Sequence, residues 1–261
     1  MVELDYNIEE LGIKAFNLCR MQSAGIRVPS FFVLSHRLLH EDENIIQQKI
    51  SQELSKMATR FYAVRSSSNL EDGINASFAG LFSTILNVPK NDVMKTVMEV
   101  FSSANRCQLH EYCKSKNISV DKVSINVIVQ EQIDSISSGI CITCIDFSPD
   151  CLYIEACRGQ CAAITDGKIV PSSYQIKRRT REIIATDCVD QSFYLTCSKS
   201  GGLQEVYSKI NVQVLSKKQL IEIANTALKI EQSLDMDAVD MEWTFDKQGL
   251  YILQARPYVR I

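Results

Sequence analysis

The sequence has few of the residues and patterns that mark several common functions. Only three of its 261 residues are histidine, at positions 36, 40 and 110. No apolar segment is as long as the roughly 18 residues that a membrane-spanning helix needs. The acidic start, MVELDYNIEELG, also lacks the pattern of a secretory signal. We therefore expect a cytoplasmic protein without a membrane segment.

The charged residues do not predict a nucleic-acid-binding surface. They make up 23% of the chain, mix both signs and leave a net charge of −3. Nucleic-acid-binding proteins usually carry a basic stripe, whereas the densest basic run here, KRRTR at 177–181, is typical of a solvated strand end. With 46% hydrophobic residues, the chain can bury one large core or form two lobes that share a cleft.

Cysteine, in contrast, is abundant. The chain has ten cysteines, and five of them fall between Cys141 and Cys161. The pair Cys141-x-x-Cys144 has two interpretations: zinc ligands, or small core residues in a reducing compartment. The surrounding GICITCIDF has the pattern of a strand, in which residues three apart point to opposite faces. This geometry favours the core interpretation.

Hydrophobic periodicity predicts an α+β chain with a helix-rich first half and a strand-rich second half. Helices are expected over 8–24, 37–59, from the cap Asn91 to about 114, and from the cap Ser216 to about 234. Strands are expected over 30–35, 61–65, 81–88, 123–133, 138–147, 151–157, in several short segments of 168–215, and in the two final segments. The strands over 123–157 are expected to form one antiparallel sheet. No repeat, low-complexity segment or linker is apparent.

The last two strands, AVDMEWTF and GLYILQARP, carry the most informative polar residues. Asp240 and Glu242 are two apart and share a face, and Gln254 and Arg256 do the same on the next strand. If the two pairs meet, the patch could be a cross-strand ion pair on a wet face. It could equally be a Mg²⁺ site with a phosphate-binding arginine, because carboxylate and amide oxygens suit Mg²⁺ and guanidinium suits phosphate. The pattern alone leaves both interpretations open.

The loop between these strands decides whether the polar pairs meet. A three-residue loop over 247–249, with Gly249 as the left-handed residue of a G1 bulge, would place Glu242 opposite Gln254. A two-residue or four-residue loop would instead place Gln254 opposite Met241 and separate the polar residues. The sequence alone leaves the length of the loop open.

Four segments, taken in order, resemble the nucleotide-binding domain of phosphoenolpyruvate synthase and pyruvate phosphate dikinase. They are LGIKAFNLCRMQSAGIRVPSFFVLS near the start, AVRSSSNLEDGINASFAGLFSTILNV, VIVQEQIDSISSGICIT and VDMEWTFDKQGLYILQARP. Each segment is modest evidence by itself, but the order and separations make the set specific, and it covers nearly the whole chain. The resemblance implies an ATP-grasp-like fold of the α+β class: one domain over 1–261, with ATP in the cleft between a lobe of roughly 1–120 and a lobe of roughly 121–261.

The resemblance also implies roles for individual residues, with ATP and Mg²⁺ as cofactors. Those expected to contact the ATP phosphates and act in catalysis are Lys14, Arg65 and Arg256. Those expected to surround or orient ATP are Ser66, Ser67 and Asp240. Those expected along the adenine pocket are Gln130 and Gln132. Those expected to bind Mg²⁺ are Glu242 and Gln254. The loop over 66–68, together with Glu71 and Asp72, would cover the phosphates. A cation and hydroxyls at the end of a buried strand fit this chemistry, because phosphate accepts hydrogen bonds from both.

Three departures from the family pattern bear on activity. The family's Gly-Gly-Lys is Gly12-Ile13-Lys14 here, and its Gly-Leu-Gly-Glu is Cys157-Arg158-Gly159-Gln160, so that Gln160 replaces an acid. The phosphohistidine domain and the pyruvate-binding barrel of the dikinases do not follow before Ile261. His36 fits a helix start better than a phosphoryl carrier. We therefore do not expect a complete dikinase cycle within this chain.

These observations favour an ATP- and Mg²⁺-dependent phosphotransferase, a kinase or dikinase half-reaction. The acceptor would be separate: a histidine on a partner protein, or a small molecule. One alternative is a non-catalytic nucleotide-binding or partner-binding module, which the loss of the acid at Gln160 favours. Another is an ATP-grasp ligase that activates a carboxylate, although a fold alone does not establish function. Nucleotide turnover and product identity separate the three.

Overall fold

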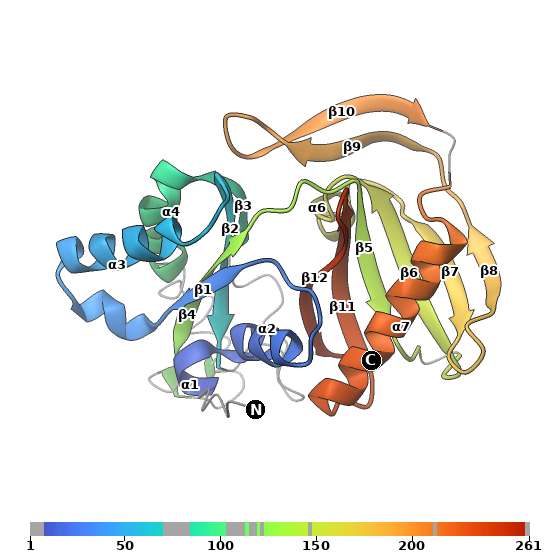
Figure 1. Ribbon diagram of the computed structural model, residues 1–261, viewed down its shortest axis with the longest axis horizontal. Coiled ribbons are helices and arrows are strands. Elements are labelled where there is room, and N and C mark those ends of the chain that lie inside the picture. The colour runs from blue at the N-terminus through green and yellow to red at the C-terminus, as the bar shows by residue number, and fades with distance from the viewer. Residues whose placement is uncertain are drawn as a thin grey trace. The chain divides into compact units, whose positions relative to one another are not determined.

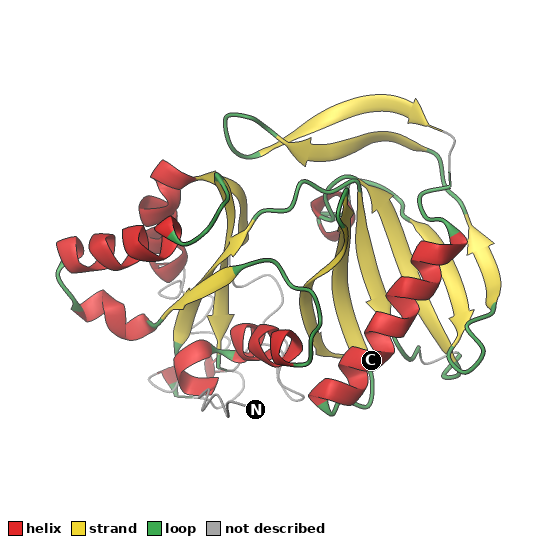
Figure 2. Ribbon diagram, in the orientation of Figure 1, coloured by secondary structure: helices red, strands yellow, loops and turns green. Residues whose placement is uncertain are grey.

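The computed structural model describes residues 8–69, 84–102, 113–114, 119–120, 123–145, 148–210 and 213–258 (Figure 1). The chain forms two compact units, the first from 1–16, 30–132 and 199–202, the second from 17–29, 133–198 and 203–261. Helices and strands occur in both units (Figure 2), so the predicted α+β class is confirmed. No helix within these described ranges is long and apolar enough to cross a membrane.

The first unit contains a four-stranded antiparallel sheet. Its order is β1 (Phe31–Leu34), β4 (Ile125–Glu131), β2 (Phe61–Ser68) and β3 (Thr84–Pro89). The prediction that 123–133 joins the strands over 138–157 was wrong, because β4 pairs on both sides with the earlier strands β1 and β2. The first unit therefore extends to Gln132, beyond the predicted lobe boundary near residue 120.

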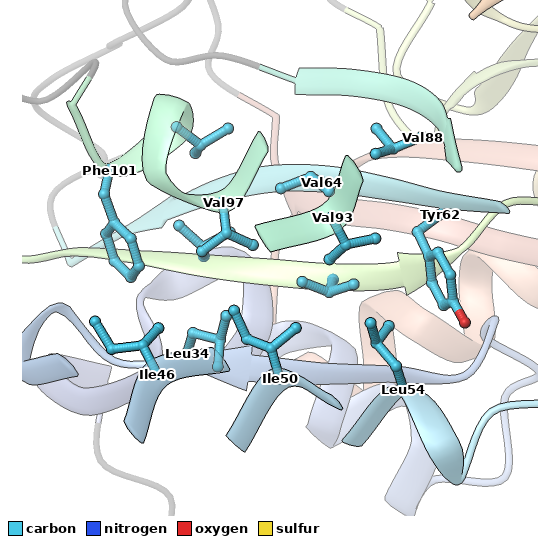
Figure 3. Packing of buried hydrophobic residues seen from close by; sticks show 13 residues of the cluster. Leu34, Ile46, Ile50, Leu54, Tyr62, Val64, Val88, Val93, Val97 and Phe101 are labelled. Carbon is cyan, nitrogen blue, oxygen red and sulfur yellow. The ribbon is translucent and has the colours of Figure 1, made fainter. Parts of the chain in front are cut away.

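One face of this sheet is covered by α3 (Glu43–Ser55) and α4 (Val93–Ser102). Their apolar side chains recur at helical spacing and point toward one another over the strands (Figure 3). The buried cluster consists of Leu34, Ile46, Ile50, Leu54, Tyr62, Val64, Val88, Val93, Val97, Val100, Phe101, Val127 and Val129. Because side chains alternate along a strand, Arg65, Ser67 and Gln130 occupy the opposite face of the sheet.

The other helical segments in the first 102 residues show where sequence periodicity was imprecise. The single helix predicted over 8–24 is divided at Gly12 into α1 (Ile8–Leu11) and α2 (Ile13–Ser23). The segment predicted as a helix over 37–59 begins with the 3-10 helix η1 (His36–His40). Asn91 does not cap α4, because it lies inside another 3-10 turn, η2 (Lys90–Asp92).

The second unit contains a six-stranded antiparallel sheet. Its order is β12 (Gly249–Pro257), β11 (Val239–Asp246), β5 (Ser137–Ile142), β6 (Cys151–Arg158), β7 (Ser172–Lys177) and β8 (Ile183–Asp187). The short helix α6 (Ala162–Thr165) follows β6, and β9 (Gln191–Cys197) and β10 (Leu203–Ile210) form a separate hairpin. Helix α7 (Lys217–Leu234) lies across one face of the larger sheet (Figure 1) and begins, as predicted, at Ser216, whose side chain forms a capping box with Gln219.

Candidate functional site

The hairpin β11–β12 brings the predicted polar residues together. Asp240 lies opposite Arg256, and Glu242 lies opposite Gln254. Arg256 Nε donates a hydrogen bond to Asp240 Oδ2 at 2.9 Å, which makes the pair a cross-strand ion pair. The two polar pairs, whose meeting the sequence left dependent on the loop, therefore do meet.

The pairing does not arise from a three-residue loop. Lys247 and Gln248 form a two-residue loop with Asp246 opposite Gly249, so the three-residue loop that would align the polar pairs directly does not form. Asp246 Oδ1 accepts hydrogen bonds from the N–H groups of Gln248 (2.6 Å) and Gly249 (3.0 Å), which stabilises the tighter turn. One extra residue in β12, Leu253, forms a β-bulge that shifts the register before the polar residues.

The polar residues of the hairpin share the sheet face that lies opposite to α7. On β11, Met241 and Trp243 are fully buried on the helix-covered face, while Asp240 and Glu242 alternate with them and are half-buried. Gln254 is 7% exposed. The site is therefore only partly accessible to water, and this strengthens electrostatic interactions with any ligand bound there.

Glu155 on β6 belongs to the same polar face, and sequence reasoning missed it. Ile140 of β5 pairs with Glu242 on one side and with Glu155 on the other, so the two acids lie in one row across three strands. Burial raises the pKa of Glu155, the charge of Asp240 raises it further, and a hydrogen bond with Tyr153 opposes both effects. The signal in the sequence was an acid placed between apolar residues of a predicted strand.

In the first unit, Arg65 and Gln130 lie on the sheet face opposite to α3 and α4. Arg65 pairs with Ile128 and Ala63 pairs with Gln130, so the two polar residues are diagonal neighbours. Arg65 is 8% exposed and Gln130 is 1% exposed. Among the residues that the structure describes, Gln130 Nε2 has no hydrogen-bond partner. A buried donor of this kind is costly unless an acceptor reaches it.

Gly12 and Ser67 place Lys14 beside the end of β2. Ala15 N donates to Ser67 Oγ at 3.1 Å, so this serine caps the start of α2. Gly12 has a φ of +75°, and a Cβ there would lie 2.2 Å from Ser67 O. A glycine is thus required here, because a larger residue would overlap the backbone of Ser67. Ser66 lies on the face that α3 and α4 cover, and Ser67 lies on the opposite face. The two serines therefore do not act from the same side of the sheet.

We expect Gly12→Ala to destabilise the protein by about 1–3 kcal/mol more than Gly25→Ala does, because a methyl group would overlap the backbone of Ser67. Gly25 is a matched control: its φ is +68°, and its added Cβ would meet only Lys229 Nζ, at 3.9 Å. Urea unfolding of both variants measures the difference. Equal losses would show that the approach of Gly12 to Ser67 is not required.

Gln132 and Gln160, which the sequence analysis singled out, form hydrogen bonds with neighbouring groups. Gln132 Oε1 accepts a hydrogen bond from Asn87 N at 3.0 Å. Gln160 is 3% exposed, and its Nε2 donates to Ile133 O at 2.8 Å and lies 3.2 Å from Cys197 Sγ. The amide that replaces the family's acid is thus a hydrogen-bond donor inside the fold. Arg158 lies over the ring of Tyr194, 5.1 Å from its centroid.

The predicted residues are distributed over both units. Those in the first unit are Lys14, Arg65, Ser66, Ser67, Gln130 and Gln132. Those in the second unit are Asp240, Glu242, Gln254 and Arg256. Glu71 and Asp72 lie outside the described residues.

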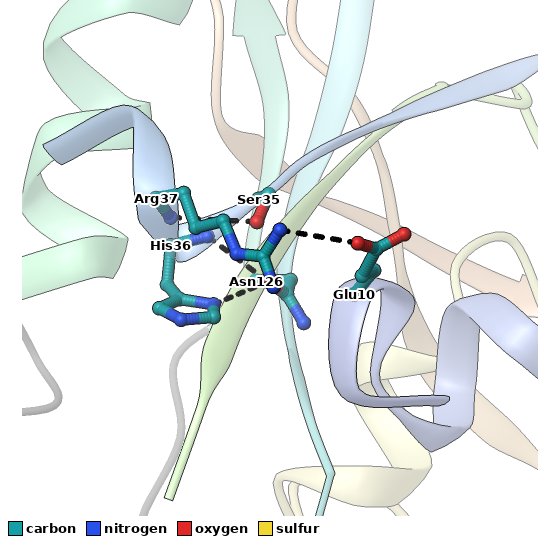
Figure 4. A network of polar contacts seen from close by, with 5 residues as sticks. All are labelled: Glu10, Ser35, His36, Arg37 and Asn126. Atoms are coloured by element: carbon teal, nitrogen blue, oxygen red, sulfur yellow. Dashed lines mark hydrogen bonds and ion pairs between the residues drawn. The ribbon is translucent and has the colours of Figure 1, made fainter. Parts of the chain in front are cut away.

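The structure also describes Cys141, Cys144 and His36, for which the sequence analysis considered metal binding or phosphoryl transfer. Cys141 is fully buried and Cys144 is 7% exposed. The described ranges contain no cluster of three or more His, Cys, Asp or Glu side chains placed to hold a metal ion. His36 begins η1, as predicted for a helix start, and its N–H donates to Asn126 Oδ1 at 3.0 Å (Figure 4). Beside it, Arg37 forms an ion pair with Glu10 at 3.2 Å.

Comparison with known proteins identifies the family. Residues 43–261 match the model of the pyruvate phosphate dikinase AMP/ATP-binding domain. The chain belongs to this family. A probable phosphoenolpyruvate synthase of Archaeoglobus fulgidus is 33% identical over 207 residues, which cover 77% of this chain and 27% of that protein. The phosphoenolpyruvate synthase of Pyrococcus furiosus is 28% identical over 232 residues, which cover 81% of this chain and 28% of that protein.

The chain therefore spans less than a third of the length of these two dikinase-family relatives. Among solved structures, a dinucleotide-forming acetyl-coenzyme A synthetase of Ca. Korarchaeum cryptofilum matches with a TM-score of 0.49 at 9% identity, over 95% of this chain and 92% of that one. The D-alanine–D-alanine ligase of Bacillus anthracis matches with a TM-score of 0.44 at 11% identity, over 92% and 54% of the two chains.

Proposed function

We propose that this chain binds ATP and passes a phosphoryl group to a separate acceptor, as the ATP-binding part of a phosphotransferase of the dikinase family. Membership of an AMP/ATP-binding domain family supports the ligand. The observation that carries the proposal is the polar face of β11–β12, where a bulge aligns two acids, an amide and a guanidinium. The acceptor would be a histidine of a partner protein or a small molecule.

The cationic residues would supply most of the catalytic effect. Phosphoryl transfer depends chiefly on positioning and on neutralising phosphate charge, with little covalent chemistry for the protein to perform. Arg256 is held by Asp240, so its guanidinium would meet the phosphates with little loss of side-chain entropy. Lys14 and Arg65 would add two further cations, and Gln130 and Gln132 would lie along the adenine base.

Glu242 and Gln254 are the residues that would hold Mg²⁺. They are cross-strand partners, and their carboxylate and amide oxygens are hard ligands of the kind that this ion prefers. Mg²⁺ sites in such enzymes commonly use one or two carboxylates together with substrate phosphates, so a small protein donor set fits the ion. When bound, Mg²⁺ supplies charge neutralisation on the phosphate oxygens.

Nucleotide products test the proposal. The purified chain would be incubated with ATP and Mg²⁺, with and without a lysate of its host, and AMP, ADP and phosphate would be resolved. We expect AMP and phosphate when an acceptor is present, and no turnover once EDTA removes the metal. ADP as the sole nucleotide product would indicate a simple kinase or a ligase. No binding of ATP in any condition would contradict the proposal.

One specific observation supports a second candidate, a non-catalytic nucleotide-binding module. Gln160 is buried and donates hydrogen bonds within the protein, so the position of the family's acid is occupied by a structural group. If ATP binds and remains intact in every condition of the same experiment, this second function is the correct one.

A further inference from the structure

We infer that Asn17 is a positioning residue, which holds β12 from its outer edge and so keeps Gln254 and Arg256 aligned with the acids of β11. The inference rests on the proposed function, because it takes Gln254 to bind Mg²⁺ and Arg256 to bind phosphate. The groups concerned, in the segment 17–29 and in the hairpin β11–β12, all belong to the second unit.

The outer edge of β12 is held by the segment 17–29. β12 is the last strand of the six-stranded sheet, so only one of its sides pairs with another strand. The N–H and C=O groups on its other side need partners from outside the sheet, because unpaired backbone groups are costly when they are buried. The segment supplies two: Asn17 Nδ2 donates to Ala255 O at 3.0 Å, and Arg27 O accepts from Ile252 N at 2.9 Å.

These two hydrogen bonds lie on either side of the bulge in β12. Ile252 precedes the extra residue Leu253, and Ala255 follows it. A bulge is an irregular stretch of the ladder, and this one decides whether Gln254 lies opposite Glu242. Because one segment of chain binds the strand before and after the bulge, both ends of the irregular stretch are fixed.

Arg27 fixes the end of β12 that is nearer to the turn. Its Nη1 donates to Gln248 O at 2.9 Å, and its Nη2 donates to Gln248 Oε1 at 2.8 Å and to Tyr251 Oη at 2.5 Å. The guanidinium also lies over the ring of Tyr251, 3.9 Å from its centroid. The contacts of Arg27 therefore hold the start of the strand, and the bond from Asn17 holds the part that carries the site residues.

Asn17 contacts the strand between its two site residues. Ala255 lies between Gln254 and Arg256, and side chains alternate along a strand, so these two share the polar face. Asn17 is 4% exposed and its hydrogen bond to Ala255 O is buried. Water would therefore replace the amide poorly. A shift of the Ala255 carbonyl would move the amide of Gln254 and the guanidinium of Arg256 together.

Asn17→Ala and Asn17→Leu test the inference, because both remove the amide donor. Leucine also fills the space of the amide and has the higher helix propensity, which helps that variant to fold. Ser172→Ala is the control: Ser172 is 1% exposed and its Oγ accepts from Val189 N at 3.1 Å, but β5 and β6 separate its strand from β11. For each protein we would measure ATP turnover, the Mg²⁺ concentration for half-maximal turnover, and hydrogen exchange of Arg256 Nε–H by NMR.

We expect both Asn17 variants to turn over ATP at least about tenfold more slowly, because small misplacements of positioned groups cost rates of this order. The Mg²⁺ concentration for half-maximal turnover should rise about fivefold, since a displaced Gln254 is a poorer ligand. Arg256 Nε–H should exchange faster, because its bond to Asp240 would loosen. Ser172→Ala should change none of the three quantities.

A loss of stability in the Asn17 variants with wild-type turnover, Mg²⁺ dependence and exchange would overturn the inference, because Asn17 would then have a structural role alone. The exchange measurement needs no nucleotide, so it separates this inference from the proposed function. If the wild type turns over no ATP, the proposed function fails. Unchanged exchange of Arg256 Nε–H would then also overturn the positioning by Asn17, and faster exchange would support it.

Discussion

Gln160→Glu, which restores the acid of the family pattern, is expected to lower the free energy of unfolding by roughly 2–4 kcal/mol at pH 7. The side chain is 3% exposed, and its Nε2 donates to Ile133 O at 2.8 Å. A carboxylate cannot donate, so the substitution would place a buried negative charge against a carbonyl oxygen. Urea unfolding measures the loss.

The pH dependence of this variant provides a second test. Burial should raise the pKa of the introduced carboxyl above its unfolded value of about 4.3. The folded state would then bind more protons than the unfolded state, so stability would fall as the pH rises through the folded pKa. At acidic pH the neutral carboxyl can donate to Ile133 O, and the deficit relative to the wild type should shrink.

Gln48→Glu is the control for this substitution, because Gln48 is exposed on α3 and its change should stay within about 0.5 kcal/mol. Wild-type stability of Gln160→Glu together with a gain in ATP turnover would contradict the prediction. That result would mean that an acid can be accommodated at this position and that its loss, not the fold, limits activity.

The sequence identified the polar residues of the last hairpin but not the backbone geometry that aligns them. Alternation along two strands defined which residues share a face, but it left the loop length open. The loop has two residues, and Asp246 stabilises it by accepting hydrogen bonds from two N–H groups in the turn. The Leu253 bulge then corrected the register. A bulge formed by an ordinary apolar residue leaves no signal in a single sequence, since neither its propensity nor its hydrophobicity differs from that of a paired strand residue.

The sequence predicted strand partners and side-chain hydrogen bonds less well than any other feature. The periodicity that identified 123–133 as a strand says nothing about which strands pair with it, and β4 joined the earlier sheet. Gln160 was recognised as a departure, but its role depends on Ile133, which only the folded chain brings within reach. The bond from Ala15 N to Ser67 Oγ was hidden in the same way, because it links residues 52 positions apart.

Arg256→Ala is expected to reduce ATP turnover by about 10³-fold, because an arginine that stabilises transferring phosphate contributes on this scale. Its effect on stability should be small, less than about 1 kcal/mol, since the ion pair with Asp240 is a cross-strand contact with 36% and 18% exposed side chains. Single-turnover kinetics and urea unfolding of the same preparation measure the two quantities.

Arg178→Ala is the matched control, since Arg178 also pairs with an acid in the second unit but lies outside the candidate site. Arg178 forms two hydrogen bonds with Glu231, at 2.5 and 3.1 Å, and another with Thr143 O. Its removal would leave a mostly buried carboxylate uncompensated, so we expect a loss of about 1.5–3 kcal/mol in stability and unchanged turnover.

The contrast between these two arginines separates the two interpretations that the sequence left open. If the polar face of β11–β12 is only a structural ion pair, Arg256→Ala should behave as a weaker version of Arg178→Ala, with a stability loss and no specific kinetic effect. If the face binds phosphate, turnover should fall while the fold persists. Arg256→Lys should then recover only part of the activity, because lysine keeps the charge but lacks the planar guanidinium that can contact a phosphate through two N–H groups.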